Sequence, residues 1–478
     1  MNSLVLPVVL PLLAAFLVQP VRHVSSGLAR WFGPAVLVLC AGLLTNIAMT
    51  SDANPVTANI GGFAPPLGIV FYADSLALLF ALVVPLFALL LWPRASDDRV
   101  SALILLLVGS GTGLAISGDL FNLFVFYELL SIACIGLVAS SHTPRAYAAT
   151  LRYLLISGFG SVLALVGITL VYTQTGSLNL AHLSELAPVH LANPLGLAAF
   201  ACLLIGFGVK AELFPVNAWV AEVYATAPKR VSALLAGVVS NLAILLLLRL
   251  LLLVFDQPEA RQILLVLGLI GLASGELAAW RARDLPRMLA FSSIGQLGLL
   301  FIAMSIPGEM GLIAALAVAL HHLLLKPALF LLAERWSGSL ADLAGAGRRA
   351  PLAAGLFTLF ALSLVGVPPL PGFWAKLVLL LGLAAQDSAL AQTAIAGVLL
   401  ITVVEAHYLF RLVGLLFTKT EHSSVPHRGG DLALASLFGV LLLASMPLLP
   451  ALADGLAWMA GQVADVGAYR ALTLGGAQ

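Results

Sequence analysis

The sequence predicts an all-α integral membrane protein, and its composition, its apolar runs and the placement of its charges all indicate this class. The chain has 478 residues, of which 61% are hydrophobic and 9% charged, with a mean hydropathy of +1.07. A soluble domain usually carries about 25% charged residues. The net charge of +1 gives no support for nucleic-acid binding.

A transmembrane helix needs about 20 apolar residues, and the chain holds about fourteen such segments. They are residues 3–20, 31–50, 69–92, 100–117, 119–140, 151–173, 195–216 (broken), 230–254, 262–281, 288–306, 310–334, 352–384 (broken), 390–417 and 432–453. The first segment has neither a basic leader nor a small-residue cleavage site, so we expect a retained helix rather than a signal peptide.

The loops between these segments alternate in charge. One set holds Arg22 and Arg30; Arg94 and Arg99; Arg145 and Arg152; Lys229 and Arg230; Arg281, Arg283 and Arg287; Arg335, Arg348 and Arg349; and Lys419 and Arg428. The other set holds Asp52, Glu185, Asp256, Glu259, Glu309, Asp387 and one basic residue, Arg261. Because basic loops stay in the cytoplasm, both termini are predicted on the outer (periplasmic) side of an inner membrane. The sequence has no GxxxxGK[ST] motif, so ATP-driven transport by this chain alone is not expected.

The segments group into a repeated plan. The predicted parts are an N-terminal three-helix segment (1–95), two five-helix repeats (100–254 and 262–418), and a C-terminal helix and tail (419–478). Proline interrupts one segment in each repeat, at 210–217 and at 368–376. An odd number of crossings makes the second repeat inverted relative to the first. Interrupted helices at matching places of inverted repeats indicate a transport site.

Ionisable residues inside apolar segments are costly and are therefore functional candidates. Glu128 lies in FNLFVFYELLSIACIG, and Lys210 lies one turn before the break at Pro215. A carboxylate close to a buried lysine favours the charged amine, and its withdrawal favours proton release. We expect Glu128 and Lys210 to couple in this way, with a purely structural ion pair as the alternative.

The second repeat supplies the other main candidates. His322 and Lys326 are four residues apart, which places both on one helix face where they could relay protons. The alternative is a histidine that caps a kink at Pro327. Lys376 follows the second break as Lys210 adjoins the first, and Glu405 lies in the next segment.

Further polar groups are accessory candidates. They are Glu212, Asn241, Glu276, His321 and His407, with Arg249 and Arg411 near helix ends. Ser292, Ser293 and Gln296 are expected to hydrogen-bond between helices or to line a wet channel. No metal site is expected, because His321 and His322 have no further ligands at suitable spacing. Cys40, Cys134 and Cys202 lie far apart in apolar runs, so we expect buried thiols and no haem or iron–sulfur cluster.

Five stretches together carry a family resemblance. They are GDLFNLFVFYELL (118–130), GFGVKAELFPVNAWVAEVYATAPKRVSALLAG (206–237), RDLPRMLAFSSIGQLG (283–298), HHLLLKPALFL (321–331) and PPLPGFWAKL (368–377). The chain resembles the antiporter-like family shared by Mrp-type multi-subunit Na+/H+ antiporters, respiratory complex I and membrane-bound hydrogenases. The stretches GGFAPPLGIVFYADSLALLFAL and YTQTGSLNLAHLSEL look most like the D subunit of the Mrp antiporters.

The resemblance implies roles by position. It matches Glu128 to the family glutamate, Lys210 to the broken-helix lysine, His322 and Lys326 to the central pair, and Lys376 to the terminal ionisable residue. The chain departs from the family at Asn241, where Lys or His is common, and at Pro286, where a basic residue is common. Glu212 and Glu405 look like additions. Because asparagine cannot hold a proton, the step between Lys210 and Lys326 is expected to need bridging water or to be weakened.

The predicted function is that of a membrane subunit of a multi-subunit monovalent cation/proton antiporter, exchanging H+ for Na+ with K+ and Li+ as alternatives. The resemblance implies partner membrane subunits, and no cofactor or catalytic site of its own is expected. One alternative is a proton-pumping subunit of a redox-driven complex. Against it, the part after Arg411 is predicted to hold one span and a short end, without a long lateral helix. A scaffold with purely structural ion pairs is the third alternative.

Overall fold

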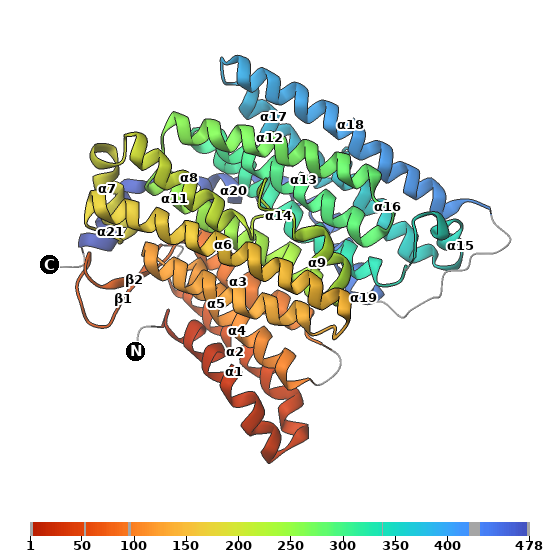
Figure 1. The fold of residues 1–478 in the computed structure, drawn as a ribbon, viewed down its shortest axis with the longest axis horizontal. Helices are drawn as coiled ribbons and strands as arrows, with labels where there is room; N and C mark the ends of the chain where they lie inside the picture. Colours follow the sequence, from red (N-terminus) through yellow and green to blue (C-terminus); the bar gives the residue numbers. More distant parts are fainter. Residues whose placement is uncertain (1–2, 52–53, 94–96, 337, 420–430, 476–478) are drawn as a thin grey trace. The chain divides into compact units, whose positions relative to one another are not determined.

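Almost all regular structure in the computed structural model is helical, as Figure 1 shows. The structure describes residues 3–51, 54–93, 97–336, 338–419 and 431–475. The chain forms two units. Unit 1 consists of Met1–Ala211, Val238–Ala260 and Gly461–Gln478, and unit 2 consists of Glu212–Gly237 and Arg261–Ala460.

Unit 1 contains the N-terminal helices and a short hairpin. Its elements are α1 (Leu6–Val24), α2 (Ser26–Thr50), β1 (Val56–Ile60), β2 (Ile69–Ala73), α3 (Ser75–Leu90), α4 (Asp98–Ala115), α5 (Leu120–Ala139), α6 (Pro144–Thr175), α7 (Leu180–His190), α8 (Pro194–Gly208), α11 (Ser240–Leu253) and α21 (Val466–Leu474). The strands are antiparallel, with Val56 opposite Ala73 and Ile60 opposite Ile69. Helix α6 packs along α8, and α4 packs between α1 and α5.

Unit 2 is built around α13 and α14, which pack side by side. Its elements are α9 (Val220–Thr226), α10 (Lys229–Leu234), most of α12 (Pro258–Arg281), α13 (Leu285–Ser305), α14 (Gly308–Ala333), a 3₁₀ turn (Ala341–Leu343), α15 (Ala346–Arg349), α16 (Pro351–Val365), α17 (Pro371–Ala384), α18 (Ala389–Phe417), α19 (Leu432–Ala444) and most of α20 (Leu449–Ala464). A π-helical turn, Leu235–Val239, joins α10 to α11.

Local sequence signals set many helix ends. Asp119 caps α5 by accepting from the Asn122 amide at 2.8 Å, and Thr143 caps α6 just before Pro144. Asp284 caps α13 in the same way. Helix α6 ends at Gly176, whose φ of 66° is the left-handed conformation that glycine adopts without strain.

The predicted membrane segments are helical over most of their length. Ten described helices are long and apolar enough to cross a membrane, and the bent pair α19 and α20 would make an eleventh. Helices α3, α8, α16 and α17 are apolar but shorter, and the last two are the halves of the broken segment 352–384. The protein is therefore an all-α integral membrane protein.

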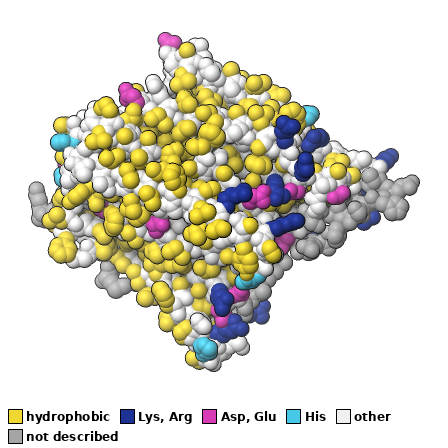
Figure 2. Space-filling model, in the orientation of Figure 1, with side chains coloured by type: hydrophobic (Ala, Val, Ile, Leu, Met, Phe, Trp, Pro, Cys, Tyr) yellow, Lys and Arg dark blue, Asp and Glu magenta, His cyan; other side chains and the backbone are white. Residues whose placement is uncertain are grey.

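Exposed side chains fit a lipid environment. Hydrophobic groups dominate the face seen in Figure 2, and the charged groups gather in a few places on it. In unit 1, Leu155 and Phe159 on α6 are 65% and 58% exposed, and in unit 2 Leu400 and Val403 on α18 are each 67% exposed. Large apolar side chains of this kind are stable on a surface when hydrocarbon covers them.

Three predicted details differ from the structure. The segment 69–92 begins with β2, because Asp74 caps α3 by accepting from the Ala77 amide at 2.8 Å and the helix starts only at Ser75. The segment 432–453 is not one continuous helix: α19 ends at Ala444, and α20 follows at an angle of 88°. Pro447 lies in this break and cannot donate a helical hydrogen bond. The tail therefore holds α20 and α21 in addition to the predicted helix.

The repeat boundaries and the orientation of the termini remain predictions. Asp52, Arg94 and Arg428, which the charge alternation used, lie outside the described residues.

Candidate functional site

The first helix break places Lys210 inside unit 1. Helix α8 ends at Gly208 and α9 begins at Val220, and the cis Phe214–Pro215 bond lies between them. An interrupted helix leaves its last carbonyls without helical donors. The Tyr127 hydroxyl on α5 donates to two of them, Gly206 O and Phe207 O, at 3.2 Å each. Tyr127 thereby ties the end of α8 to α5.

Lys210 is only 1% exposed, and α5 and α6 surround its amine. Nζ donates to Ser131 Oγ, and it lies 3.9 Å from the centre of the Tyr127 ring and 5.9 Å from that of Tyr153. Aromatic faces attract a cation, most strongly where water is excluded. This environment can hold the charged amine without a direct carboxylate partner.

Glu128 lies on the same helix as Ser131 but reaches a different neighbour. Its Oε1 accepts from Ser161 Oγ on α6 at 2.6 Å, and the side chain is half-buried. No ion pair joins Glu128 to Lys210 in the described part of the chain, although the two charges interact electrostatically. Any coupling between them therefore acts without direct contact. We call Tyr127, Glu128, Ser131, Ser161 and Lys210 the first cluster.

Unit 2 contains a larger set of buried polar groups, which α13 organises. His322 and Lys326 are both fully buried on α14 and face neighbouring serines of α13. His322 Nε2 lies 3.1 Å from Ser293 Oγ, and Lys326 Nζ donates to Ser292 Oγ at 2.8 Å. The predicted common face of the two α14 residues is confirmed, and the serines hydrogen-bond between helices.

The second helix break positions Lys376. Helix α16 ends at Val365, its C-cap Gly366 has a left-handed φ of 89°, and α17 starts at Pro371. Lys376 Nζ donates to Val365 O at 3.2 Å and forms an ion pair with Glu405 Oε2 at 2.6 Å. Gln296 Nε2 donates to the other oxygen of Glu405 at 2.8 Å. Helices α13, α17 and α18 thus meet at one carboxylate.

Glu276 on α12 lies beside this group. It is 1% exposed, and its Oε2 accepts from the Tyr408 hydroxyl at 2.8 Å. Its Oε1 lies against Gly295, where a Cβ would come within 2.1 Å of that oxygen. Glycine at position 295 therefore leaves the space that the Glu276 carboxylate occupies. Glu276 interacts electrostatically with Glu405, Lys326 and Lys376.

The remaining predicted residues fall into different surroundings. Glu212 is buried and accepts hydrogen bonds from Tyr224 and Ser293. His321 Nε2 lies 2.9 Å from the Ser363 hydroxyl, within hydrogen-bond distance. His407 is exposed and packs edge-on against Trp280 at 6.0 Å, away from these bonds. We call the residues that share these contacts the second cluster: Glu212, Tyr224, Glu276, Ser292, Ser293, Gln296, His322, Lys326, Lys376, Glu405 and Tyr408.

Asn241, Arg249 and Arg411 are not members of either cluster. Asn241 is fully buried in α11, just after the π-helical turn. Arg249 is buried and pairs with Asp74 at 2.5 Å, which favours a structural ion pair over a functional role. Arg411 is exposed, as expected for a side chain that reaches the surface.

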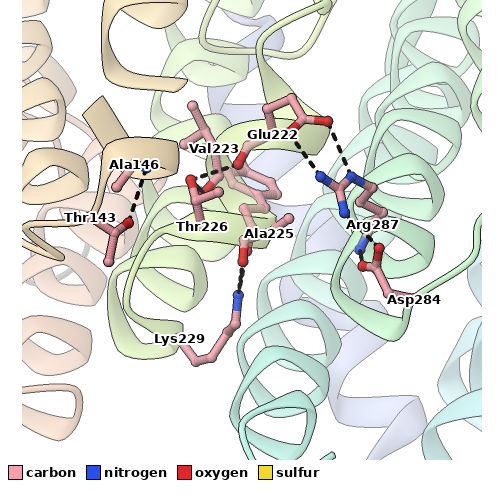
Figure 3. Close-up of polar contacts among 10 residues, drawn as sticks. Thr143, Ala146, Glu222, Val223, Ala225, Thr226, Lys229, Asp284 and Arg287 are labelled. Carbon is pink, nitrogen blue, oxygen red and sulfur yellow. Dashed lines mark hydrogen bonds and ion pairs between the residues drawn. The ribbon is translucent and has the colours of Figure 1, made fainter. Parts of the chain in front are cut away.

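An ionic contact outside the second cluster joins α9 to α13 (Figure 3). Arg287 donates to both oxygens of Glu222, at 3.1 and 2.9 Å, and to Asp284 at 2.6 Å. Lys229 Nζ donates to the Tyr224 and Ala225 carbonyls at 2.7 and 3.0 Å, where it caps the end of α9. These contacts fix the short helix that follows the first break.

Sequence reasoning named Ser292 and Ser293 but missed the tyrosine hydroxyls and Ser131, which also contact the charged groups. Tyr127, Tyr224 and Tyr408 look like ordinary apolar positions in the sequence, although Tyr408 follows Glu405 by three residues and therefore shares its helix face. Ser131 gave a similar signal three residues after Glu128. No group of three or more metal-binding side chains occurs in the described part of the chain.

Known proteins resemble the chain over most of its length. The family described as "NADH:quinone oxidoreductase/Mrp antiporter, TM" matches residues 117–402. The N subunit of the NADH-quinone oxidoreductase of Desulforudis audaxviator is 31% identical over 87% of this chain and 86% of that protein. The D subunit of the Na(+)/H(+) antiporter of Alkalihalophilus pseudofirmus is 29% identical over 86% of each chain. A chain of the membrane-bound sulfane sulfur reductase, an archaeal respiratory membrane complex, has a TM-score of 0.91 and 30% identity, covering 99% of this chain and 100% of that chain.

Proposed function

Because the chain belongs to the NADH:quinone oxidoreductase/Mrp antiporter family, we propose that it is a membrane subunit of a multi-subunit antiporter that exchanges H+ for Na+. The supporting observation is that each helix break lies beside a buried lysine, Lys210 in unit 1 and Lys376 in unit 2. Intramembrane charges of this kind are costly and mark ion paths. The relative that belongs to a Na(+)/H(+) antiporter supports Na+ as the exchanged cation.

The chemistry of the clusters suits proton transfer. Lysine, glutamate and histidine can each gain or lose a proton, and serine and tyrosine hydroxyls can accept one proton while passing on another. In the second cluster Lys376 donates to Glu405, Lys326 donates to Ser292, and Tyr408 donates to Glu276. We assign proton translocation to Glu128, Lys210, His322, Lys326, Lys376 and Glu405. The chain then needs no cofactor of its own for this step.

The proposal extends to location and partners. The chain would lie in the inner (plasma) membrane with both termini on the periplasmic side, as the alternation of loop charges predicts. It would work with other membrane subunits, because the similar solved structure is part of a respiratory membrane complex.

A second candidate is a proton-pumping subunit of a redox-driven complex. The observations that favour it are the 31% identity to a component of an NADH-quinone oxidoreductase and the TM-score of 0.91 to a respiratory membrane complex. The two candidates share the proton path and differ in what drives it. Isolation of the complex distinguishes them, since redox-active partner subunits favour the second and small membrane subunits without redox centres favour the first.

Transport by everted vesicles tests the leading proposal. The complete complex is expressed in cells that lack their own antiporters, and Na+ addition is followed with a dye that reports the pH gradient. Lys210→Ala should abolish Na+-dependent proton movement, because alanine cannot carry the proton. Lys419→Ala, which removes an exposed lysine, is the matched control. Normal transport by the Lys210→Ala complex would reject the proposal.

A further inference from the structure

Glu212 lies in an uncommon environment at the first helix break. Its backbone φ is 55°, a left-handed conformation that is strained for a residue with a side chain. The residue is only 1% exposed. Its Oε2 is buried without a hydrogen-bond partner among the described residues. A strained backbone and an unsatisfied buried carboxylate oxygen are costs that a purely structural residue would have no reason to carry.

The other oxygen of Glu212 is held by hydroxyl groups. Oε1 accepts from the Tyr224 hydroxyl at 2.6 Å and from Ser293 Oγ at 3.2 Å. Tyr224 comes from α9 and Ser293 from α13, so two helices of unit 2 orient the carboxylate.

Ser293 also contacts a second titratable group. Its Oγ lies 3.1 Å from His322 Nε2, and both residues are fully buried. A serine hydroxyl has one proton to donate and lone pairs with which to accept. While Ser293 donates to Glu212, it can therefore accept the Nε2–H of His322. Glu212, Ser293 and His322 form a continuous hydrogen-bonded line that needs no water.

We propose that Glu212 exchanges a proton with His322 through the Ser293 hydroxyl. The proposal rests on the proposed function, because the transported proton is what loads His322. In the step, the Nε2–H bond of the imidazolium breaks and a bond to Ser293 Oγ forms. The original Ser293 O–H proton moves to Glu212 Oε1. A neutral imidazole and a neutral carboxylic acid result, and the reverse step restores both charges.

The charges around Glu212, Ser293 and His322 favour a proton that can rest at either end of this hydrogen-bonded line. Lys326 interacts electrostatically with Glu212 and lies one turn from His322 on α14. His321 is the residue next to His322 in the chain. From the neighbouring elements, α9 presents the Tyr224 hydroxyl and α13 presents Ser293. A proton on Lys326 repels one on His322 and attracts the Glu212 carboxylate, so the state of Lys326 biases where the shared proton rests.

Four variants of the complete complex test this line. Glu212→Gln keeps the size and the hydrogen bonds from Tyr224 and Ser293 but cannot titrate. Ser293→Ala removes the link, and Ser293→Thr restores a hydroxyl. Ser305→Ala is the matched control, because Ser305 is buried on the same helix and donates to Ile302 O of that helix.

We expect Glu212→Gln and Ser293→Ala to slow Na+-dependent proton movement about ten-fold or more, since proton transfer by a placed group is worth about 10²–10⁴-fold. Ser293→Thr should recover most of the rate, and Ser305→Ala should leave it unchanged. Wild-type rates in Glu212→Gln or Ser293→Ala would overturn the proposal. Equal losses in Ser293→Ala and Ser305→Ala would also overturn it, because a general packing defect would then be the cause.

A measurement on the purified complex separates this proposal from the proposed function. Infrared difference spectra between acid and alkaline pH should contain a carboxylic-acid band that disappears in Glu212→Gln and shifts in Ser293→Ala. Absence of antiport in the wild type would reject the proposed function while the band could still be seen. Absence of the band, with antiport intact, would reject the role of Glu212 alone.

Discussion

The ion pair between Lys376 and Glu405 gives the sharpest stability prediction. Its atoms are 2.6 Å apart, and the two residues are 8% and 2% exposed. Removing one partner of a buried pair leaves an uncompensated charge and costs about 3–5 kcal/mol. Glu405→Ala also deprives the Gln296 amide of its acceptor, which costs a further ~1–3 kcal/mol. Lys376→Ala leaves Glu405 that same amide donor, so Glu405→Ala should be the more damaging single change.

The double variant, Lys376→Ala with Glu405→Ala, removes both charges together. Its loss of stability should be smaller than the sum of the two single losses, by about 2 kcal/mol or more, because no unpaired charge remains. Unfolding of the purified chain by sodium dodecyl sulfate in mild detergent, followed by tryptophan fluorescence, measures all four proteins. Additive losses would refute the reasoning, since they would mean that the two side chains contribute independently despite their contact.

Two further predictions concern contacts outside the clusters. Arg287→Lys should lower the unfolding free energy by about 1 kcal/mol or less, as much as Arg287→Gln does, because an ammonium group cannot reproduce the two-pronged contact with Glu222. A lysine variant as stable as the wild type in the detergent titration would contradict this. Asp119→Ala removes the cap on α5 and should lower the unfolding free energy by about 1 kcal/mol, whereas Asp119→Asn keeps a capping oxygen and should lose less. Equal losses in the two variants would speak against this.

Several predictions from sequence agree with the structure because they depend on local chemistry. Apolar runs of sufficient length form helices wherever the chain must satisfy its backbone groups internally, so the predicted segments are helical. Pro215 interrupts one of them, and Pro368, Pro369 and Pro371 interrupt another. The four-residue spacing of His322 and Lys326 places both on one face of α14, as helix geometry requires.

The pairing of the candidate residues was not predictable in the same way. The expected coupling of Glu128 with Lys210 has no direct contact, because Ser131 and Tyr127 occupy the surroundings of the amine. The contact of Glu405 with Lys376 was not anticipated. Residues on different helices meet through packing, and single-sequence periodicity carries no information about which face of one helix opposes another.

The sequence by itself determined that this protein is a bundle of membrane helices with buried lysines, glutamates and histidines and two proline breaks. Hydrophobicity and helix periodicity act along the chain, so they can be read from it. The tertiary structure alone decided which hydroxyls connect those charges. It placed Ser293 of α13 between Glu212 and His322, and it gave Glu212 a left-handed backbone at the break. These arrangements depend on contacts between residues about 30–110 positions apart, which only the folded packing of unit 2 brings together.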